Sequence, residues 1–151
     1  MGYNIKNLKP KVHSRTKQGY LDPRTCQKLF PGIQNQPIEY RSKWEKIYAH
    51  HLESNPDVKY WGSECIEIPY QLLTDGSHHK YFPDFMVEKQ DGTKIIVEIK
   101  PKAQCCKPTT KNHWLWNEYV KNISKWTAAK QFCESRGYKF MVLTEKTIMS
   151  L

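Results

Sequence analysis

Residues 81–100 read YFPDFMVEKQDGTKIIVEIK, and this stretch contains two strand-like segments on either side of a tight turn. The dipeptide Asp91-Gly92 indicates a β-hairpin, because the central positions of such turns favour residues that tolerate a positive φ. We therefore predict one strand over about residues 80–87 and another over 94–100, folded back beside it. This pairing would bring the start of the first strand close to the end of the second.

The second of these strands carries charge at the end of an apolar run. Side chains alternate between the two faces of a strand, so Glu98 and Lys100 share a face with Ile96. Buried charges are costly unless they are paired or bound to a cation. The hairpin can place Asp84 next to Glu98. Two carboxylates and a lysine are therefore predicted to converge at one edge of the sheet.

Such a group suits the hydrolysis of a phosphodiester with Mg²⁺, or with Mn²⁺ as a substitute. These cations take oxygen ligands, neutralise charge on the phosphate and lower the pKa of a bound water. Asp84 and Glu98 would bind the metal, while Lys100 would orient the water or stabilise the developing charge. A lone Pro-Asp usually means a turn, and a lone E-x-K usually means a solvated ion pair. Their combination on adjacent strands favours the metal site.

Glu45 is the fourth predicted catalytic residue and the third predicted metal ligand. It lies three residues after Ser42, which is the spacing of a capping box at the start of a helix. Apolar residues at helical intervals extend this helix to about residue 54, before Asn55-Pro56. The alternative is that Glu45 only caps the helix and pairs with Arg41.

The remaining pattern predicts a strand over 58–69, a long helix over about 112–135 and a last strand over 138–144. The order α-β-β-β-α-β indicates one α/β domain over residues 40–151, with a mixed sheet flanked by helices. Residues 1–39 are predicted to form a basic, proline-rich and mostly extended arm, because prolines at this density prevent a long helix. Part of this arm is expected to pack on the domain through its apolar side chains: Tyr20, Leu21, Leu29, Phe30 and Ile33.

The composition points to a polyanionic partner. The chain has 24 Lys and Arg against 15 Asp and Glu, a net charge of +9. Nucleic acid is the first partner to consider and an anionic membrane the second. No apolar run approaches the roughly 20 residues of a membrane span, so we expect a cytosolic protein. Cys105 and Cys106 with His113 fit no standard zinc spacing.

Basic side chains outside the predicted catalytic group are candidates for contact with DNA phosphates. They are Arg41, His79, Lys102, Lys107, Lys111 and Lys121. Contacts of this kind position a duplex without reading its sequence, so we expect double-stranded DNA to be bound with little sequence specificity. The long helix also carries aromatic residues at helical spacing, which either stack on unpaired bases or pack in the core. They are Trp114, Trp116, Tyr119 and Trp126.

Several motifs occur together: RSKWE at 41–45, YFPDF at 81–85, EIKPK at 98–102, and KWTAA at 125–129 before GYKFMVLTE. In this combination the chain resembles the head completion nucleases of T4-type tailed phages. They are a branch of the PD-(D/E)xK superfamily that is also similar to the TnsA transposition endonuclease. The resemblance covers about residues 40–145. It implies a restriction-endonuclease-like fold with a Mg²⁺ site, the catalytic set Glu45, Asp84, Glu98 and Lys100, and Lys125 as a further contact to DNA.

The resemblance also implies a biological setting. It suggests a Mg²⁺-dependent DNA endonuclease of phage head completion or DNA packaging, with capsid or portal proteins as further partners. Such a protein would act in the host cytoplasm during assembly or in association with the virion. Two alternatives stay open: a structural head-joining protein that uses the nuclease fold as a scaffold, and a branched-DNA resolvase.

Overall fold

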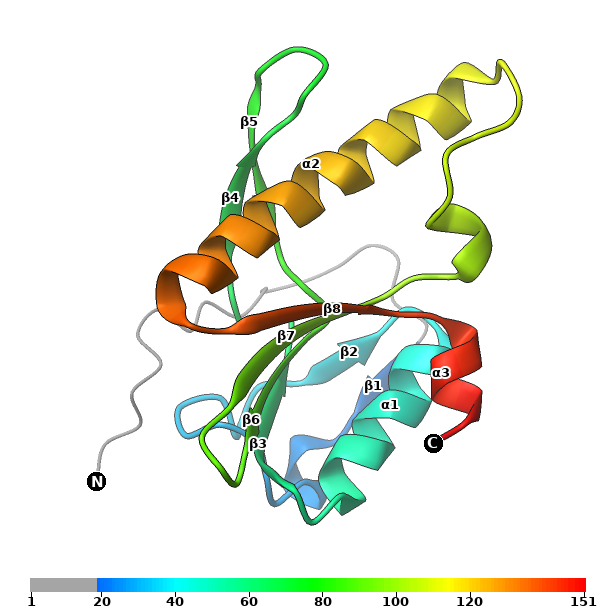
Figure 1. Ribbon diagram of the computed structural model, residues 1–151. Helices are drawn as coiled ribbons and strands as arrows, with labels where there is room; N and C mark the ends of the chain where they lie inside the picture. Colours follow the sequence, from blue (N-terminus) through cyan, green and yellow to red (C-terminus); the bar gives the residue numbers. More distant parts are fainter. Residues whose placement is uncertain (1–18) are drawn as a thin grey trace.

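The computed structural model describes residues 19–151, and its centre is a four-stranded mixed sheet (Figure 1). The strand order is β3 (Val58–Ser63), β6 (Phe85–Lys89), β7 (Lys94–Ile99) and β8 (Lys139–Leu143). β6 runs antiparallel to both β3 and β7, and β8 is parallel to β7. The predicted hairpin is confirmed, since the backbone N–H of Lys89 donates to Thr93 O (2.8 Å) across the Asp91-Gly92 turn.

Helices cover both faces of this sheet. α1 (Lys43–Ser54) and the short α3 (Glu145–Met149) lie on one side, and the long α2 (His113–Arg136) lies on the other (Figure 1). The alternation predicted for β7 decides which residue meets which helix. Ile95, Val97 and Ile99 pack with Tyr48 and Leu52 of α1, whereas Ile96 packs in a second cluster with Ala129 and Cys133 of α2.

Two predicted strands are each divided, which corrects the predicted element order. The segment 58–69 holds β3 and β4 (Ile68–Gln71), and the segment 80–87 holds β5 (His78–Tyr81) and β6. β4 and β5 pair as a separate antiparallel ribbon beside α2 (Figure 1). The break after β3 occurs at Glu64, whose φ of 47° turns the chain out of the main sheet. A positive φ at glutamate has no local sequence signal.

Residues 19–40 share the core of the domain. β1 (Gly19–Leu21) pairs with β2 (Ile38–Tyr40), and Leu29 forms a bridge with Trp61 of β3. Leu29, Phe30, Ile33 and Ile38 are all buried. The apolar part of the predicted arm therefore packs as expected, except for Tyr20, which is 50% exposed. Most basic residues of the arm lie outside the described residues: Lys6, Lys9, Lys11, Arg15 and Lys17.

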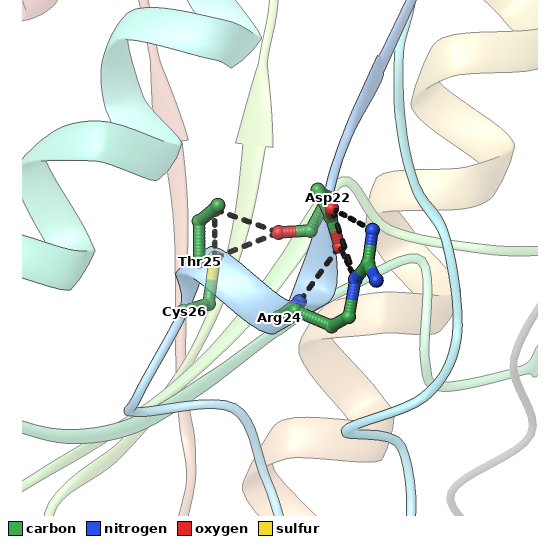
Figure 2. A network of polar contacts seen from close by, with 4 residues as sticks. All are labelled: Asp22, Arg24, Thr25 and Cys26. Atoms are coloured by element: carbon green, nitrogen blue, oxygen red, sulfur yellow. Dashed lines mark hydrogen bonds and ion pairs between the residues drawn. The ribbon is translucent and has the colours of Figure 1, made fainter.

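Local capping residues define where the helices begin and end. Ser42 accepts a hydrogen bond from Glu45 N (3.2 Å), Asn112 accepts one from Trp114 N (2.9 Å), and Gly137 ends α2 in the left-handed conformation. Figure 2 shows the same chemistry at the turn after β1, where exposed Asp22 binds both the backbone and the guanidinium of Arg24. None of the helices within residues 19–151 is long and apolar enough to cross a membrane.

Candidate active site

A pocket of about 400 Å³ lies where the ends of β3 and β7, the start of β6, β5 and the N-terminus of α1 meet α2. Its acidic lining residues are Glu45, Glu64, Asp84 and Glu98. Its basic lining residues are Arg41, Lys80, Lys100, Lys121 and Lys125. The four residues predicted to be catalytic therefore line one pocket, although they come from three separate parts of the chain.

Asp84 is attached to the end of β7. Its Oδ2 accepts a hydrogen bond of 2.8 Å from the backbone N–H of Ile99, the residue between Glu98 and Lys100. The antiparallel register that pairs Phe85 with Val97 makes this contact possible. Desolvation raises the pKa of Asp84 well above its usual range, and the nearby charges of Glu98 and Glu45 raise it further.

Glu98 is only 8% exposed, and its Oε2 accepts a hydrogen bond of 2.6 Å from the hydroxyl of Tyr81. Burial raises the pKa of this carboxyl group, whereas the Tyr81 hydroxyl and the charges of Lys100 and Lys125 act in the opposite direction. Lys100 continues the pairing of β7 with β8, because its backbone N–H donates to Leu143 O (2.9 Å). Glu98 in β7 and Lys100 directly after it are thus both held by pairing with β8.

Glu45 both caps α1 and lines the pocket. Its Oε2 accepts a hydrogen bond of 3.1 Å from the backbone N–H of Arg41, and its own N–H donates to Ser42 Oγ. Burial raises the pKa of the Glu45 carboxyl group, with the Arg41 contacts opposing the rise. The two interpretations of Glu45 are therefore compatible: a capping acid in the first helical turn also faces the other carboxylates.

Glu64 and Tyr81 are pocket residues that the sequence reasoning missed. Glu64 is the one non-glycine residue with a positive φ between residues 19 and 151. It is 6% exposed, its carboxylate pairs with the Arg41 guanidinium, and its N–H donates to Asp84 O (3.0 Å). Tyr81 belongs to the YFPDF motif, three positions before Asp84, so the motif itself was a usable signal. Glu64 had none, because it lies within what reads as a continuous strand.

The predicted DNA contacts divide into two groups. Arg41, Lys121 and Lys125 line the pocket. Lys125 Nζ lies 5.4 Å from the centre of the Tyr81 ring, and burial lowers the pKa of its ammonium group. The other group lies away from the pocket, as exposed side chains on the ribbon or on the loop before α2: His79, Lys102, Lys107 and Lys111.

The donor chemistry of the pocket suits a hard divalent cation, although no ready-made cage is present. Within residues 19–151, no three His, Cys, Asp or Glu side chains are close enough together to hold a metal ion. However, burial raises the pKa values of Asp84, Glu98 and Glu45, and the charges of neighbouring carboxylates raise those of Asp84 and Glu45 further. A cation with oxygen ligands would remove that repulsion. Their carboxylate oxygens are the kind of ligand that Mg²⁺ or Mn²⁺ takes.

Comparison with known proteins places the chain in a family. The model of the TnsA-like endonuclease N-terminal family matches residues 55–145, more than half of the chain. The chain belongs to the TnsA-like endonuclease family. It is also 36% identical over 124 residues to the protein named head completion nuclease of Enterobacteria phage T4, covering 76% of this chain and 83% of that protein. The predicted resemblance is thereby confirmed.

Most of the pocket of this TnsA-like nuclease lies inside the segment that matches the family. That segment contains Glu64, Tyr81, Asp84, Glu98, Lys100, Lys121 and Lys125. Arg41 and Glu45 precede it. The start of α1 therefore completes the pocket from outside the matched segment, and Arg41 joins the two parts through its contacts with Glu45 and Glu64.

Proposed function

We propose that this protein is a Mg²⁺-dependent DNA endonuclease that acts in phage head completion. The observation that carries the proposal is the convergence of Asp84, Glu98, Lys100 and Glu45 in one pocket with several basic side chains. Membership of an endonuclease family supports the reaction class. The name of the phage T4 relative supports the biological setting, in which capsid or portal proteins would be partners.

Each pocket residue has a distinct role in this proposal. Asp84, Glu98 and Glu45 would hold the cation, which when bound supplies charge neutralisation and a water of lowered pKa. Tyr81 fixes the orientation of the Glu98 carboxylate through its hydrogen bond. Lys100 orients the attacking water or stabilises negative charge on the phosphate. Arg41, Lys121 and Lys125 bind phosphate oxygens beside it.

The expected substrate is double-stranded DNA with little sequence specificity. A net charge of +9 favours a polyanion. The basic residues that line the pocket suit contacts to phosphates, which position DNA and carry no direct sequence information. Action during assembly would take place in the host cytoplasm, or later in association with the virion.

The test is a cleavage assay with supercoiled, linear and branched DNA in the presence of Mg²⁺, Mn²⁺ or EDTA. We expect cleavage with either metal, none with EDTA, and none by Asp84→Asn, which keeps the size and the Ile99 contact of Asp84. Failure to cleave any form of DNA with metal would refute the enzyme and favour a structural role. Cleavage of branched DNA alone would favour a resolvase.

A further inference from the structure

A second pocket, of about 350 Å³, lies between the first half of α2 and the loop that leads to it. The loop contains η2 (Lys102–Gln104), and Ala103, Gln104 and residues 106–110 form one wall. The other wall is a face of α2 with Trp114, Leu115 and Tyr119. This volume is within the range of small-ligand sites. The pocket shares no lining residue with the active-site pocket.

The α2 wall is aromatic and open to solvent. Trp114 is 67% exposed and Leu115 is 40% exposed. For Trp114, the core-packing interpretation of the aromatic helix is therefore wrong. An exposed indole at the edge of a pocket offers a flat apolar face to a ligand. Lys107 lies on the opposite wall, with its Nζ 5.5 Å from the centre of the Trp116 ring.

Asn122 gives this pocket a polar group that lacks a partner. The residue is 5% exposed and lines the pocket. No hydrogen bond joins its side-chain amide to any other residue in the described part of the chain. The amide atoms themselves keep contact with solvent, because they are not fully buried in the way that Trp126 Nε1 is, so a ligand in the pocket can reach them. A ligand with both donors and acceptors on its edge would satisfy both the oxygen and the nitrogen of this amide.

The second pocket adjoins the active site along two segments of the chain. Asn122 is three residues before Lys125, so the two side chains are separated by about 5 Å along the axis of α2 and lie on neighbouring faces. The loop that forms the other wall begins directly after Lys100. A DNA strand with a phosphate at Lys125 would therefore pass Asn122 first, and Trp114 lies about 16 Å from Lys125 along the axis of α2, further along the same strand.

We propose that the second pocket binds an unpaired nucleobase of the DNA substrate, a short distance along the strand from the phosphate that is cut. The base would stack against Trp114 or Tyr119, and its edge would hydrogen-bond to the Asn122 amide. Aromatic faces and an amide are the groups with which proteins bind bases that are free of the duplex. An apolar side chain of a protein partner would leave Asn122 unsatisfied. Glu118 also lines the pocket and can accept from an exocyclic amino group.

This inference rests on the proposed function, since it takes DNA to be the substrate. It names the substrate class more narrowly: DNA with unpaired bases at the cut site, as at a frayed end, a gap or a branch. The protein would then prefer such DNA to a continuous duplex of the same length.

The test is DNA binding without cleavage, with fluorescently labelled single-stranded and duplex oligonucleotides of equal length in EDTA. We expect Trp114→Ala to weaken single-strand binding by about 5- to 150-fold, the usual effect of losing one stacked base. Duplex binding should change by less than about twofold. Asn122→Leu should also act on the single strand alone, provided that its thermal unfolding matches wild type. Met149→Ala, which removes an apolar side chain that is 70% exposed on α3, should change neither.

Wild-type single-strand affinity in Trp114→Ala would overturn the inference, and so would an equal loss on both kinds of DNA. Trp114 is exposed, so its variant should fold and the test does not depend on Asn122. A failure of the nuclease proposal itself would be detected by the cleavage assay and not by this binding assay. In that case no DNA would be cleaved with metal, while the selective effect of Trp114→Ala on binding could still be present.

Discussion

The hydroxyl of Tyr81 donates a hydrogen bond of 2.6 Å to Oε2 of Glu98, and both groups are almost fully buried. This contact joins the ribbon strand β5 to the central strand β7 at the pocket. It stabilises the ionised form of a carboxyl group whose pKa is raised by burial. The charge on Glu98, and with it the proposed affinity for a cation, therefore depends on a tyrosine from outside the main sheet.

Tyr81→Phe should shift the acidic limb of the pH profile of cleavage upward by about one unit. The hydrogen bond lowers the pKa of Glu98, so its loss raises that pKa and a higher pH is needed to ionise the ligand. A hydrogen bond to a charged group contributes about 1.5 kcal/mol or more, and one pKa unit corresponds to about 1.4 kcal/mol. The rate at high pH should return toward wild type. Tyr48→Phe, at a buried tyrosine of α1, is the control.

Asp84→Asn should stabilise the protein at neutral pH in the absence of divalent metal. The pKa of Asp84 is raised in the folded state, so wild type loses stability as pH rises from the unfolded value of about 4 through the folded value. The asparagine does not ionise, so the variant avoids this loss of stability. The loss is about 1.4 kcal/mol for each unit by which folding raises the pKa of Asp84. Urea unfolding in EDTA at pH 4 and pH 7.5 measures the difference. The difference in the free energy of unfolding between the two proteins should be small at pH 4, and at pH 7.5 the variant should be the more stable.

Adding Mn²⁺ to the same proteins tests the metal assignment. Wild type should gain stability at pH 7.5, because the cation binds only the folded protein, whereas Asp84→Asn should gain much less. An equal gain in the two proteins would contradict the role of Asp84 as a ligand.

Lys100→Ala should abolish cleavage while cation binding survives, because the lysine is assigned to the water or the phosphate. Glu98→Gln should lose both activities, since it removes a charged ligand. Lys100→Arg should restore little, because a guanidinium is larger and does not readily give up its proton. Calorimetry with Mn²⁺ and a cleavage assay separate the two roles. Wild-type cleavage by Lys100→Ala would rule out the assigned E-x-K site.

Glu64→Gln should lower kcat/KM by about 10-fold or more, because Glu64 holds the Arg41 guanidinium at the pocket. A backbone at φ 47° for a non-glycine residue costs about 1–3 kcal/mol, which such a positioning role explains. Arg41→Gln should have a similar effect, and the double variant should be no worse than the more severe single one. The matched control is the exposed pair Asp22–Arg24 (Figure 2), whose neutralisation should leave the rate unchanged. Additive losses at Arg41 and Glu64 would exclude their coupling.

The sequence by itself determined the elements whose causes are local. The Asp91-Gly92 turn, the alternation of β7, the cap at Ser42 and the long helix over about residues 112–135 all agree with the structure. Turn chemistry, capping and side-chain periodicity depend on neighbours within a few residues. For this reason the opposite placement of Ile95 and Ile96, and the meeting of Asp84 with Glu98, were predictable without coordinates.

Only the tertiary structure decided the division of two predicted strands, the position of Glu64 and the exposure of Trp114. The conformation of Glu64 is set by Arg41 and by the backbone of Asp84, which are 23 and 20 positions away in the sequence. Trp114 has the spacing of a core residue, yet the start of α2 extends beyond the sheet that would have covered it (Figure 1). Contacts between distant segments decide such features, because burial and strain depend on what lies opposite a residue and not on its neighbours in the chain.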